Sequence, residues 1–518
     1  MNEPQGRSAR RILLALCFGA VLSGCTVGPD FVPPEPATPP AWIEPPAEGL
    51  DARPADLVAW WRVFDDPVLD ELVETAVRSN NTLEIAALRV LEARAQLGIA
   101  TGSVYPQVQI AAGDATYLSP PDNSGLTSGD WSYSLGATAA WEIDFWGRFR
   151  RGIESADAAF LASIAAYDQA RVLLTGAVVG AYATVRSLEE QLRIAEENVK
   201  IQQRSFDIAQ VLFENGADSE LDMQQAKTLL LSTQATIPGL EIALAQARNA
   251  LSTLLGEAPG ALRPLLAQNA GIPAIPDDIA IGLPADMLRR RPDVRQAELQ
   301  AQAANALVGL AEADLYPSFS LTGSIGLAAG AGDSDFGDLF DSDALTWSIG
   351  PSFVWPFLNY GRIRNNVRVQ DARLQQSLIA YRETVLQAAR EAEDAMASFI
   401  GTRKQREILE QTVDSAMRSN DLSTLRYAEG FSDYERVLNA QQALFNQQQR
   451  FVTNQGDAVR ALVSLYTALG GGWEGRDGLP WVDPDTLEVM GDRTNWGSLL
   501  EGVEVTPVAS GSNVTTDQ

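Results

Sequence analysis

The sequence predicts an α+β membrane protein that is internally duplicated, with four β-strands and two long helical hairpins in each protomer. The stretch WEIDFWGR at Trp141 returns as WPFLNYGR at Trp355, 214 residues later, and the same offset separates Gly216 from Gly430. An alternation of apolar and polar residues precedes each stretch, and a long heptad pattern without proline follows each. Because solenoid repeats recur about every 20 to 50 residues, so long an offset indicates a duplicated domain.

The first 66 residues are interpreted as a targeting segment followed by a tether. Residues 1–24 combine a basic start with an apolar stretch that is too short to span a bilayer. Small residues then precede Cys25, which resembles a bacterial lipoprotein signal, so we expect Cys25 to carry acyl chains such as palmitate. Thr26 stands where an aspartate would retain a lipoprotein in the inner membrane, which favours the outer membrane. The many prolines of residues 25–66 predict an extended tether from the lipid to the fold.

Two β-hairpins are predicted, in residues 105–147 and 316–360. Each strand is about ten residues long, the length that crosses a bilayer at a tilt. A half-buried soluble sheet alternates in the same way, but small hydroxyl residues on one face are expected in an aqueous lumen, and aromatic residues at one end are expected at a membrane interface. In the first strand, the expected apolar positions are Val108, Ile110 and Ala112. The aromatic residues at the end are Trp141, Phe145, Trp146, Trp355, Phe357 and Tyr360.

Helical patterns fill most of the remaining chain. Residues 148–256 and 361–470 are each expected to form a long helical hairpin, because residues seven apart, such as Leu192, Val199 and Phe206, are apolar. At about 1.5 Å per residue, the first helix of each hairpin would be roughly 100 Å long. The other expected segments are a helix in 67–104, a connector and a helix in 257–315, and a partly disordered C-terminal tail in 471–518.

The WGR and YGR stretches mark the two places where a membrane strand becomes a long helix. Glycine tolerates the bend that this transition requires. Two hairpins supply four strands, whereas about eight strands are the fewest that fill a closed barrel. Because open strand edges do not occur in lipid, the protomers must pool their strands. A three-fold ring of twelve strands would enclose an aqueous bore.

Composition excludes several classes of function. The chain has 39 basic and 67 acidic residues, a net charge of −28, which argues against a nucleic-acid partner. It contains no histidine, which removes the commonest general base and the commonest transition-metal ligand. Its two cysteines, Cys17 and Cys25, lie too close to the start to form a disulfide framework or a zinc site. An enzyme with paired carboxylates is the remaining catalytic alternative, but the acidic residues are scattered at helical spacing, the usual pattern of solvated faces.

A calcium-binding module is a second alternative, suggested by an acidic run. The run consists of Asp333, Asp335, Asp338, Asp341 and Asp343. EF-hand spacing counted from Asp333 requires glutamate at position 344, where this sequence has alanine. Residues 333–343 are therefore interpreted as an acidic external loop between two strands. We expect neither a metal site nor a cofactor other than the lipid on Cys25.

Several motifs together resemble the TolC-like outer-membrane factors of tripartite efflux pumps, specifically their lipoprotein branch. They are CTVGPDF from Cys25, GLPAD from Gly282, RRPD from Arg290, VLNAQ from Val437, and the YP and WGR/YGR pairs. The resemblance covers most of residues 25 to 473. It implies a homotrimer with a twelve-stranded β-barrel in the outer membrane, continued by a periplasmic α-helical coiled-coil barrel.

The resemblance also implies function and partners. It implies a passive exit duct with no catalysis of its own, which meets a periplasmic adaptor (membrane fusion) protein and an inner-membrane transporter, commonly of the resistance-nodulation-division class. Drugs or other small molecules would leave through it. A duct for type I protein secretion or for metal-ion export is the alternative within the family, because the transporter selects the cargo.

The turns of the helical hairpins are expected to form the periplasmic mouth and to contact the adaptor, since they lie farthest from the strands. The tip residues are Phe213, Glu214, Asn215, Gly216, Ala217, Glu429, Gly430, Phe431 and Ser432.

A gate is expected beside these turns, where Tyr427 and Asp222 would form a hydrogen bond between neighbouring hairpins. The alternative is that Tyr427 is only the last apolar residue of the heptad pattern. Asp218, Glu220, Asp433 and Glu435 add negative charge, so the opening should prefer cations. Where the family has an acidic constriction, this sequence has Arg436 and Asn439.

Overall fold

The structure is a computed structural model that describes most of the chain. The described residues are 26–35, 42–43, 50–51, 57–118, 130–268, 271–276, 278–280, 288–329, 336–474 and 481–500. The expected signal segment, Cys25, Asp333 and Asp335 lie outside them.

The chain divides into two compact units. The first, here called the sheet unit, consists of Met1–Glu35, Leu91–Ser163 and Gln296–Tyr381. The second, here called the helical unit, consists of Pro36–Val90, Ile164–Arg295 and Arg382–Gln518. Each unit therefore takes segments from both copies of the repeat.

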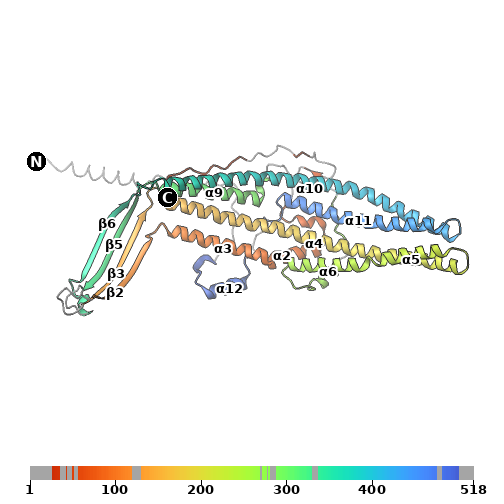
Figure 1. The fold of residues 1–518 in the computed structure, drawn as a ribbon, viewed down its shortest axis with the longest axis horizontal. Coiled ribbons are helices and arrows are strands. Elements are labelled where there is room, and N and C mark those ends of the chain that lie inside the picture. The colour runs from red at the N-terminus through yellow and green to blue at the C-terminus, as the bar shows by residue number, and fades with distance from the viewer. Residues whose placement is uncertain are drawn as a thin grey trace. The chain divides into compact units, whose positions relative to one another are not determined.

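A four-stranded antiparallel sheet forms the sheet unit's β-structure (Figure 1). Its strands are β2 (Val108–Leu118), β3 (Asp130–Ile143), β5 (Ser318–Ala329) and β6 (Leu345–Val354). Their order is β2-β3-β5-β6, so each copy contributes one hairpin and the two hairpins meet where β3 pairs with β5. This arrangement confirms the predicted duplicated α+β fold with two hairpins.

The register of the strands separates an apolar face from a polar face. Trp141 lies opposite Leu321, and Ile325 lies opposite Trp347, on what we call the apolar face. On the opposite, polar face the Ser324 hydroxyl lies 2.8 Å from the Ser348 hydroxyl. The alternation of side chains along a strand produces this separation.

The sequence predicts that Val108, Ile110 and Ala112 form the apolar side of β2, and the register shows that this side does not join the apolar face. Val108 and Ile110 lie opposite Ala140 and Thr138, which places them on the polar face. The other face of β2 carries Gln109, small residues and one large apolar residue, Tyr117, which lies opposite Trp131. The alternation within β2 is therefore too weak to determine the phase, which pairing with β3 decides.

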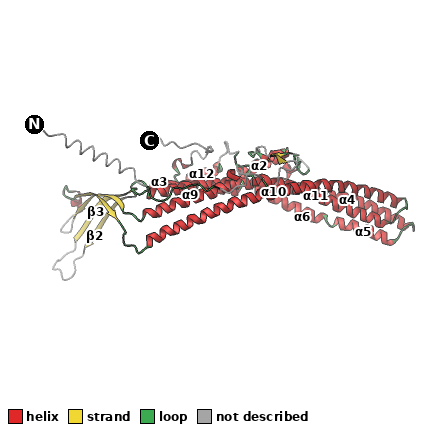
Figure 2. Cartoon of the chain, turned by 90° about the horizontal axis from the view of Figure 1, so that it is seen from above, coloured by secondary structure: helices red, strands yellow, loops and turns green. Residues whose placement is uncertain are grey.

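Most of the described chain is helical (Figure 2). In chain order the helices are α2 (Pro67–Ser79), α3 (Asn81–Gly102), α4 (Arg148–Glu214), α5 (Glu220–Gln234), α6 (Ile237–Leu254), α7 (Arg263–Leu266), α9 (Pro292–Ala313), α10 (Arg362–Ala428), α11 (Tyr434–Ala468) and α12 (Pro484–Arg493). Short elements are β1 (Leu50–Asp51), which pairs with β4 (Ile279–Ala280), and the 3-10 helices η1 (Trp60–Phe64), η2 (Phe336–Phe340) and η3 (Gly497–Leu499). No helix in the described ranges is both long enough and apolar enough to cross a membrane.

The two longest helices repeat each other. Helices α4 and α10 each contain 67 residues and are offset by 214 residues at both ends. The side of α4 that is buried in this chain follows part of the expected seam. Val178, Val185 and Ala195, seven-residue positions of that seam and its neighbour, are buried, whereas Leu192 and Val199 are only half buried. Beside Val199, the polar residues Asn198 and Gln202 are buried instead, so the apolar seam remains partly open there.

Two predicted helices are interrupted. The return helix of the first hairpin ends at Gln234 and resumes as α6, whose second residue is Pro238; proline lacks the N–H that a continuous helix needs. Helix α11, without proline, is continuous over 35 residues. The helix expected in 67–104 is broken at Asn80, whose side-chain oxygen accepts a 2.8 Å hydrogen bond from the Leu83 N–H and caps α3.

One residue of the predicted tether and one of the predicted tail are packed in the helical unit. Trp60, within the predicted tether, is 2% exposed and stacks on Tyr466 with ring centroids 5.0 Å apart. Trp481, within the predicted tail, stacks on Tyr167 at 4.7 Å. Trp60 and Trp481 therefore belong to the core of the helical unit, where their aromatic rings are buried.

Candidate functional site

The two hairpin turns of the helical unit have the same backbone structure. Gly216 follows α4 with φ +69°, and Gly430 follows α10 with φ +77°. The next N–H donates backward in each case, from Ala217 to Leu212 at 2.8 Å and from Phe431 to Arg426 at 2.8 Å. Only glycine adopts a positive φ without strain, which is why both helices end at these residues.

Tyr427 joins the two turns. Its hydroxyl donates a hydrogen bond to the Asp218 carboxylate, so the expected partner, Asp222, is wrong. Asp222 instead accepts a 2.9 Å bond from the Ser219 hydroxyl, and Ser219 caps the start of α5. The bond therefore links the end of α10 to the turn between α4 and α5.

A small apolar cluster surrounds this bond. The rings of Tyr427 and Tyr434 lie 5.3 Å apart at 66°, close to an edge-to-face arrangement. We call the set of buried residues here the tip cluster: Ala209, Ala226, Tyr427, Tyr434 and Val437. Tyr427 thus packs in the cluster and also donates the hydrogen bond, so both of its expected roles are present.

The electrostatics of the tip shift the pKa values of its two carboxyl groups in opposite directions. Burial raises the pKa of the Asp218 carboxyl, but hydrogen bonds from Asp222, Tyr427 and the Ser219 N–H outweigh burial and leave that pKa below its ordinary value. Burial and the adjacent Asp218 raise the pKa of Asp222. Burial and Asp218 also raise the pKa of the Tyr427 hydroxyl, which remains a donor. Burial raises the pKa of Tyr434 to about 12.

The other predicted site residues lie outside the tip cluster. The exposed ones on the turns and the following helices are Phe213, Glu214, Asn215, Gly216, Ala217, Glu220, Glu429, Gly430, Phe431, Asp433, Glu435, Arg436 and Asn439, and Ser432 is half buried. Phe431 is the most exposed large side chain of the turns, at 71%.

A buried polar layer between α4 and α11 was not anticipated. The Gln441 amide donates to the Ser205 hydroxyl at 2.6 Å, and the Asn198 amide donates to the Gln448 side-chain oxygen at 2.7 Å. Asn198 and Ser205 are seven residues apart, so the same heptad spacing that indicated the apolar seam could have revealed this layer.

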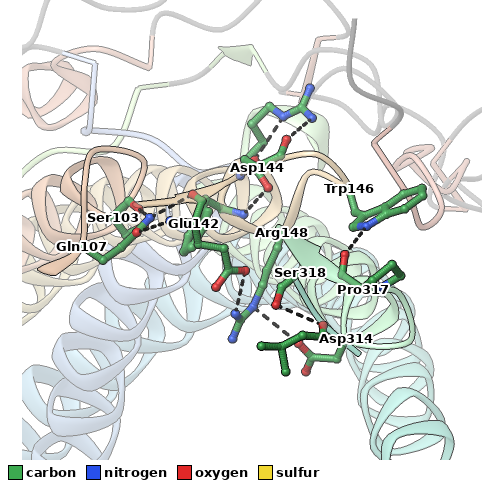
Figure 3. Close-up of polar contacts among 12 residues, drawn as sticks. Ser103, Gln107, Glu142, Asp144, Trp146, Arg148, Asp314, Pro317 and Ser318 are labelled. Atoms are coloured by element: carbon green, nitrogen blue, oxygen red, sulfur yellow. Dashed lines mark hydrogen bonds and ion pairs between the residues drawn. The ribbon is translucent and has the colours of Figure 1, made fainter. Parts of the chain in front are cut away.

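The WEIDFWGR stretch forms a polar junction where β3 ends and α4 begins (Figure 3). The Asp144 carboxylate accepts hydrogen bonds from the backbone N–H groups of Phe149 at 3.1 Å and Arg150 at 2.9 Å, and so caps the helix. Arg148 contacts Glu142 at 3.3 Å and Asp314 at 3.5 Å. The junction thus couples the last strand residues to the first helical turn.

In both copies of the junction, a tryptophan indole N–H donates a hydrogen bond to a backbone carbonyl just after the preceding helix. Trp141 donates to the Val104 carbonyl at 2.9 Å, and Trp355 donates to the Leu315 carbonyl at 3.1 Å. The donors are 355 − 141 = 214 residues apart and the acceptors 315 − 104 = 211, so both are corresponding positions of the two copies, which differ in length by three residues between them. The duplication therefore extends to individual hydrogen bonds. Trp146 adds a 2.8 Å bond to the Pro317 carbonyl (Figure 3).

The residues after Cys25 occupy a cradle in the same unit. Arg151, 4% exposed, donates to the carbonyls of Val27 at 3.2 Å and Gly28 at 3.1 Å and pairs with Asp30 at 2.9 Å. A Cβ at Gly309 would lie 2.9 Å from the Val27 oxygen, so only glycine leaves room there. Residues 27–30 are therefore held beside the junction, where the Val27 N–H also donates to the Trp146 carbonyl at 3.1 Å.

No metal site is found in the described part of the chain: no group of three or more His, Cys, Asp or Glu residues is arranged to hold a metal ion. Of the acidic run, Asp338, Asp341 and Asp343 are described, and all three are exposed.

Comparison with known proteins places this geometry in a family. The family model "Outer membrane efflux protein" matches residues 72–257 and 283–471, one match for each copy of the repeat. The chain is 32% identical over 473 residues to the probable efflux pump outer membrane protein TtgC of Pseudomonas putida, covering 89% of this chain and 96% of TtgC. It is 30% identical over 464 residues to nodulation protein T of Rhizobium leguminosarum bv. trifolii, covering 88% of this chain and 96% of that protein.

A solved structure agrees. The outer-membrane channel OprN superimposes with a TM-score of 0.80 and 32% identity, over 87% of this chain and all of that chain. The family description and TtgC are named for efflux through the outer membrane, and OprN is named as an outer-membrane channel. With both halves matched by the family model, this chain belongs to the outer membrane efflux protein family.

Proposed function

We propose that this chain is the outer-membrane exit duct of a tripartite efflux pump, through which drugs or other small molecules leave passively. The observation that carries the proposal is the sheet, whose register places large apolar side chains on one face and hydroxyl groups on the other. A sheet with these faces fits lipid outside and water inside. Each strand pair leads, through the junction, into a 67-residue helix.

A homotrimer follows from the edges of the sheet. Strands β2 and β6 are at the edges of the four-stranded sheet, and lipid does not tolerate unpaired edges. Pairing β6 of one copy with β2 of the next in a ring of three gives a twelve-stranded barrel, wide enough for an aqueous bore. The half-buried Leu192 and Val199 on α4 supply an apolar stripe for a neighbouring copy, so the helices form a coiled-coil barrel in the periplasm.

The helical turns form the periplasmic mouth and contact the adaptor and, beyond it, an inner-membrane transporter. Exposed Phe431 supports this role, because a large apolar side chain at the end of a hairpin favours a protein contact. The bond between Tyr427 and Asp218 holds the two turns together in the resting state and breaks when the pump docks.

Acylation of Cys25 supplies a second anchor. The cradle around Val27 supports this, because Arg151 and Gly309 fix the chain two residues after Cys25 beside the strand ends. An acyl chain attached nearby can enter the same membrane as the strands.

Drug susceptibility tests the function. Deletion of the gene in its host should lower the tolerated concentrations of several unrelated drugs, and plasmid-borne wild-type protein should restore them. Normal drug tolerance with a lost secreted protein, or with sensitivity to one metal ion, would instead favour the alternatives of type I secretion or metal-ion export.

A photocrosslinker at Phe431 tests the assignment of the mouth. It should capture the adaptor, while the matched control at Ile242, a similarly exposed residue on α6, should not. Equal capture at both positions, or capture of outer-membrane proteins alone at Phe431, would reject the tip as the docking site.

A further inference from the structure

Five aromatic rings form a continuous series at the end of the sheet away from the junctions. Tyr117 contacts Trp131 at 5.4 Å between centroids, and Trp131 stacks on Tyr133 at 6.0 Å. Phe336 of η2 meets Tyr133 edge-on at 5.4 Å, and Phe340 meets Phe336 at 5.8 Å. We call these rings the distal aromatic cluster. The aromatic residues that the sequence predicts at a membrane interface, such as Trp141, lie at the opposite end of the sheet.

The register shows that this cluster lies on the apolar face. Tyr133 is two residues from Leu135 along β3, and Leu135 pairs with Leu327, both on that face. Phe336 contacts the Tyr133 ring, so η2 is folded back over the same face. Helix η2 therefore packs against the apolar face of the sheet.

Helix η2 has a buried side and an exposed aromatic pair. Leu339 is 3% exposed, as a packed residue should be, and Ala329 at the end of β5 is also buried. Phe336 and Phe340 remain 59% and 64% exposed, although each carries a large apolar ring. Two such rings, continuous with an apolar face, indicate a surface that an apolar environment covers.

We infer that η2 is a lipid-contact element that inserts Phe336 and Phe340 into the outer-leaflet interface of the membrane, while Asp341 faces the water. The inference rests on the proposed function, in which the apolar face meets lipid. It assigns a role to part of the acidic loop: its aromatic residues anchor the outer end of the sheet.

Spacing along β3 supports an interfacial position. Trp131 and Trp141 are ten residues apart on the same face. At about 3.3 Å per residue they are separated by roughly 33 Å along the strand, which a tilt of about 40° reduces to roughly 25 Å across the membrane. This matches the height of the apolar band of a membrane barrel, with one aromatic belt at each edge.

The topology disfavours another protein chain as the occupant. A neighbouring protomer would pair at β2 or β6, whereas η2 lies over the ends of β3 and β5, the two inner strands. The position of η2 on the apolar face also argues against a role in blocking the aqueous bore, because a segment that closed the bore would lie on the polar face.

Site-directed spin labelling tests the inference in the intact mature protein, reconstituted in vesicles of phosphatidylcholine and phosphatidylglycerol. A nitroxide is attached at Phe340→Cys and, as the matched neighbour, at Asp341→Cys. Collisions with oxygen report lipid, and collisions with a water-soluble nickel chelate report water. The unmutated protein is the blank, since an acylated Cys25 does not react with the label.

The label at position 340 should show an oxygen-to-nickel collision ratio several-fold higher than the label at 341. Equal ratios, or strong nickel access at 340, would overturn the inference, and so would protection from both reagents, which indicates a protein contact. Phe336→Cys repeats the test if Phe340→Cys does not fold.

A label at Ile325→Cys, in the middle of the apolar face, separates this inference from the proposed function. Lipid exposure at 325 with water at 340 rejects only the role of η2. Water at 325 rejects the membrane sheet itself.

Discussion

Replacing Tyr427 with phenylalanine removes one hydroxyl from the tip cluster and leaves the ring. The lost bond has a charged acceptor, for which a net contribution of about 1.5 to 3 kcal/mol is typical. We take the lower end, because Asp218 is only partly buried and water can replace the phenol. About 1.4 kcal/mol is a tenfold change in an equilibrium. Tyr427→Phe should therefore shift the balance from joined to separated turns by roughly tenfold in each protomer.

Single-channel recording of purified protein in planar bilayers, without adaptor or pump, measures this shift. Tyr427→Phe and Asp218→Asn should both raise the time spent in high-conductance states. Tyr434→Phe is the matched control, since that ring belongs to the same cluster but is not part of the Tyr427 bond to Asp218. Unchanged conductance in both test variants, or an equal increase in the control, would show that packing rather than the bond joins the turns.

The same recordings should depend on pH. The pKa of Asp222 is raised in the joined tip, so the protonated form of Asp222 stabilises the joined turns. This stabilisation grows as the pH falls toward the raised pKa and is lost as the pH rises through that pKa. Asp218, with a lowered pKa, keeps its charge and its bond to Tyr427 until the pH falls below its ordinary value of 3.8. Conductance should therefore fall as the pH is lowered toward 3.8, and Asp222→Asn should abolish that dependence.

Three further outcomes are expected. Arg291, 5% exposed, pairs with two carboxylates and donates to a backbone carbonyl, so Arg291→Ala should lower the unfolding free energy by about 3 kcal/mol in denaturant titrations. The control Arg290→Ala loses one half-exposed ion pair and should lower it by about 1 kcal/mol or less. Similar losses in the two variants would contradict the argument from burial. Gly309→Ala should release the cradle and speed amide exchange near residue 27, whereas Gly98→Ala, with open space around it, should not. Cys25→Ser should lose acyl mass in mass spectrometry of the mature protein yet still insert through its strands; an unmodified wild-type Cys25 would remove the anchor.

The sequence by itself determined the features that depend on residues close together in the chain. The duplication, the two hairpins, the long helices and their glycine ends were all predictable, because the period of a pattern records which side of an element is apolar and glycine records where φ is positive. Family membership followed from the same motifs. In the candidate site, the turns and the participation of Tyr427 could be located in this way.

Only the tertiary structure decided which groups meet. Asp218 and Asp222 both lie within a few residues of the turn, and no local rule selects the one that Tyr427 reaches; the packing of one hairpin against the other does. The phase of β2 depended on its register with β3, and the placement of Trp60 and Trp481 depended on partners hundreds of residues away. Likewise, η2 was apparent only as an acidic loop until its fold onto Tyr133 was known. Such contacts depend on long-range geometry, which a sequence pattern of short period does not contain.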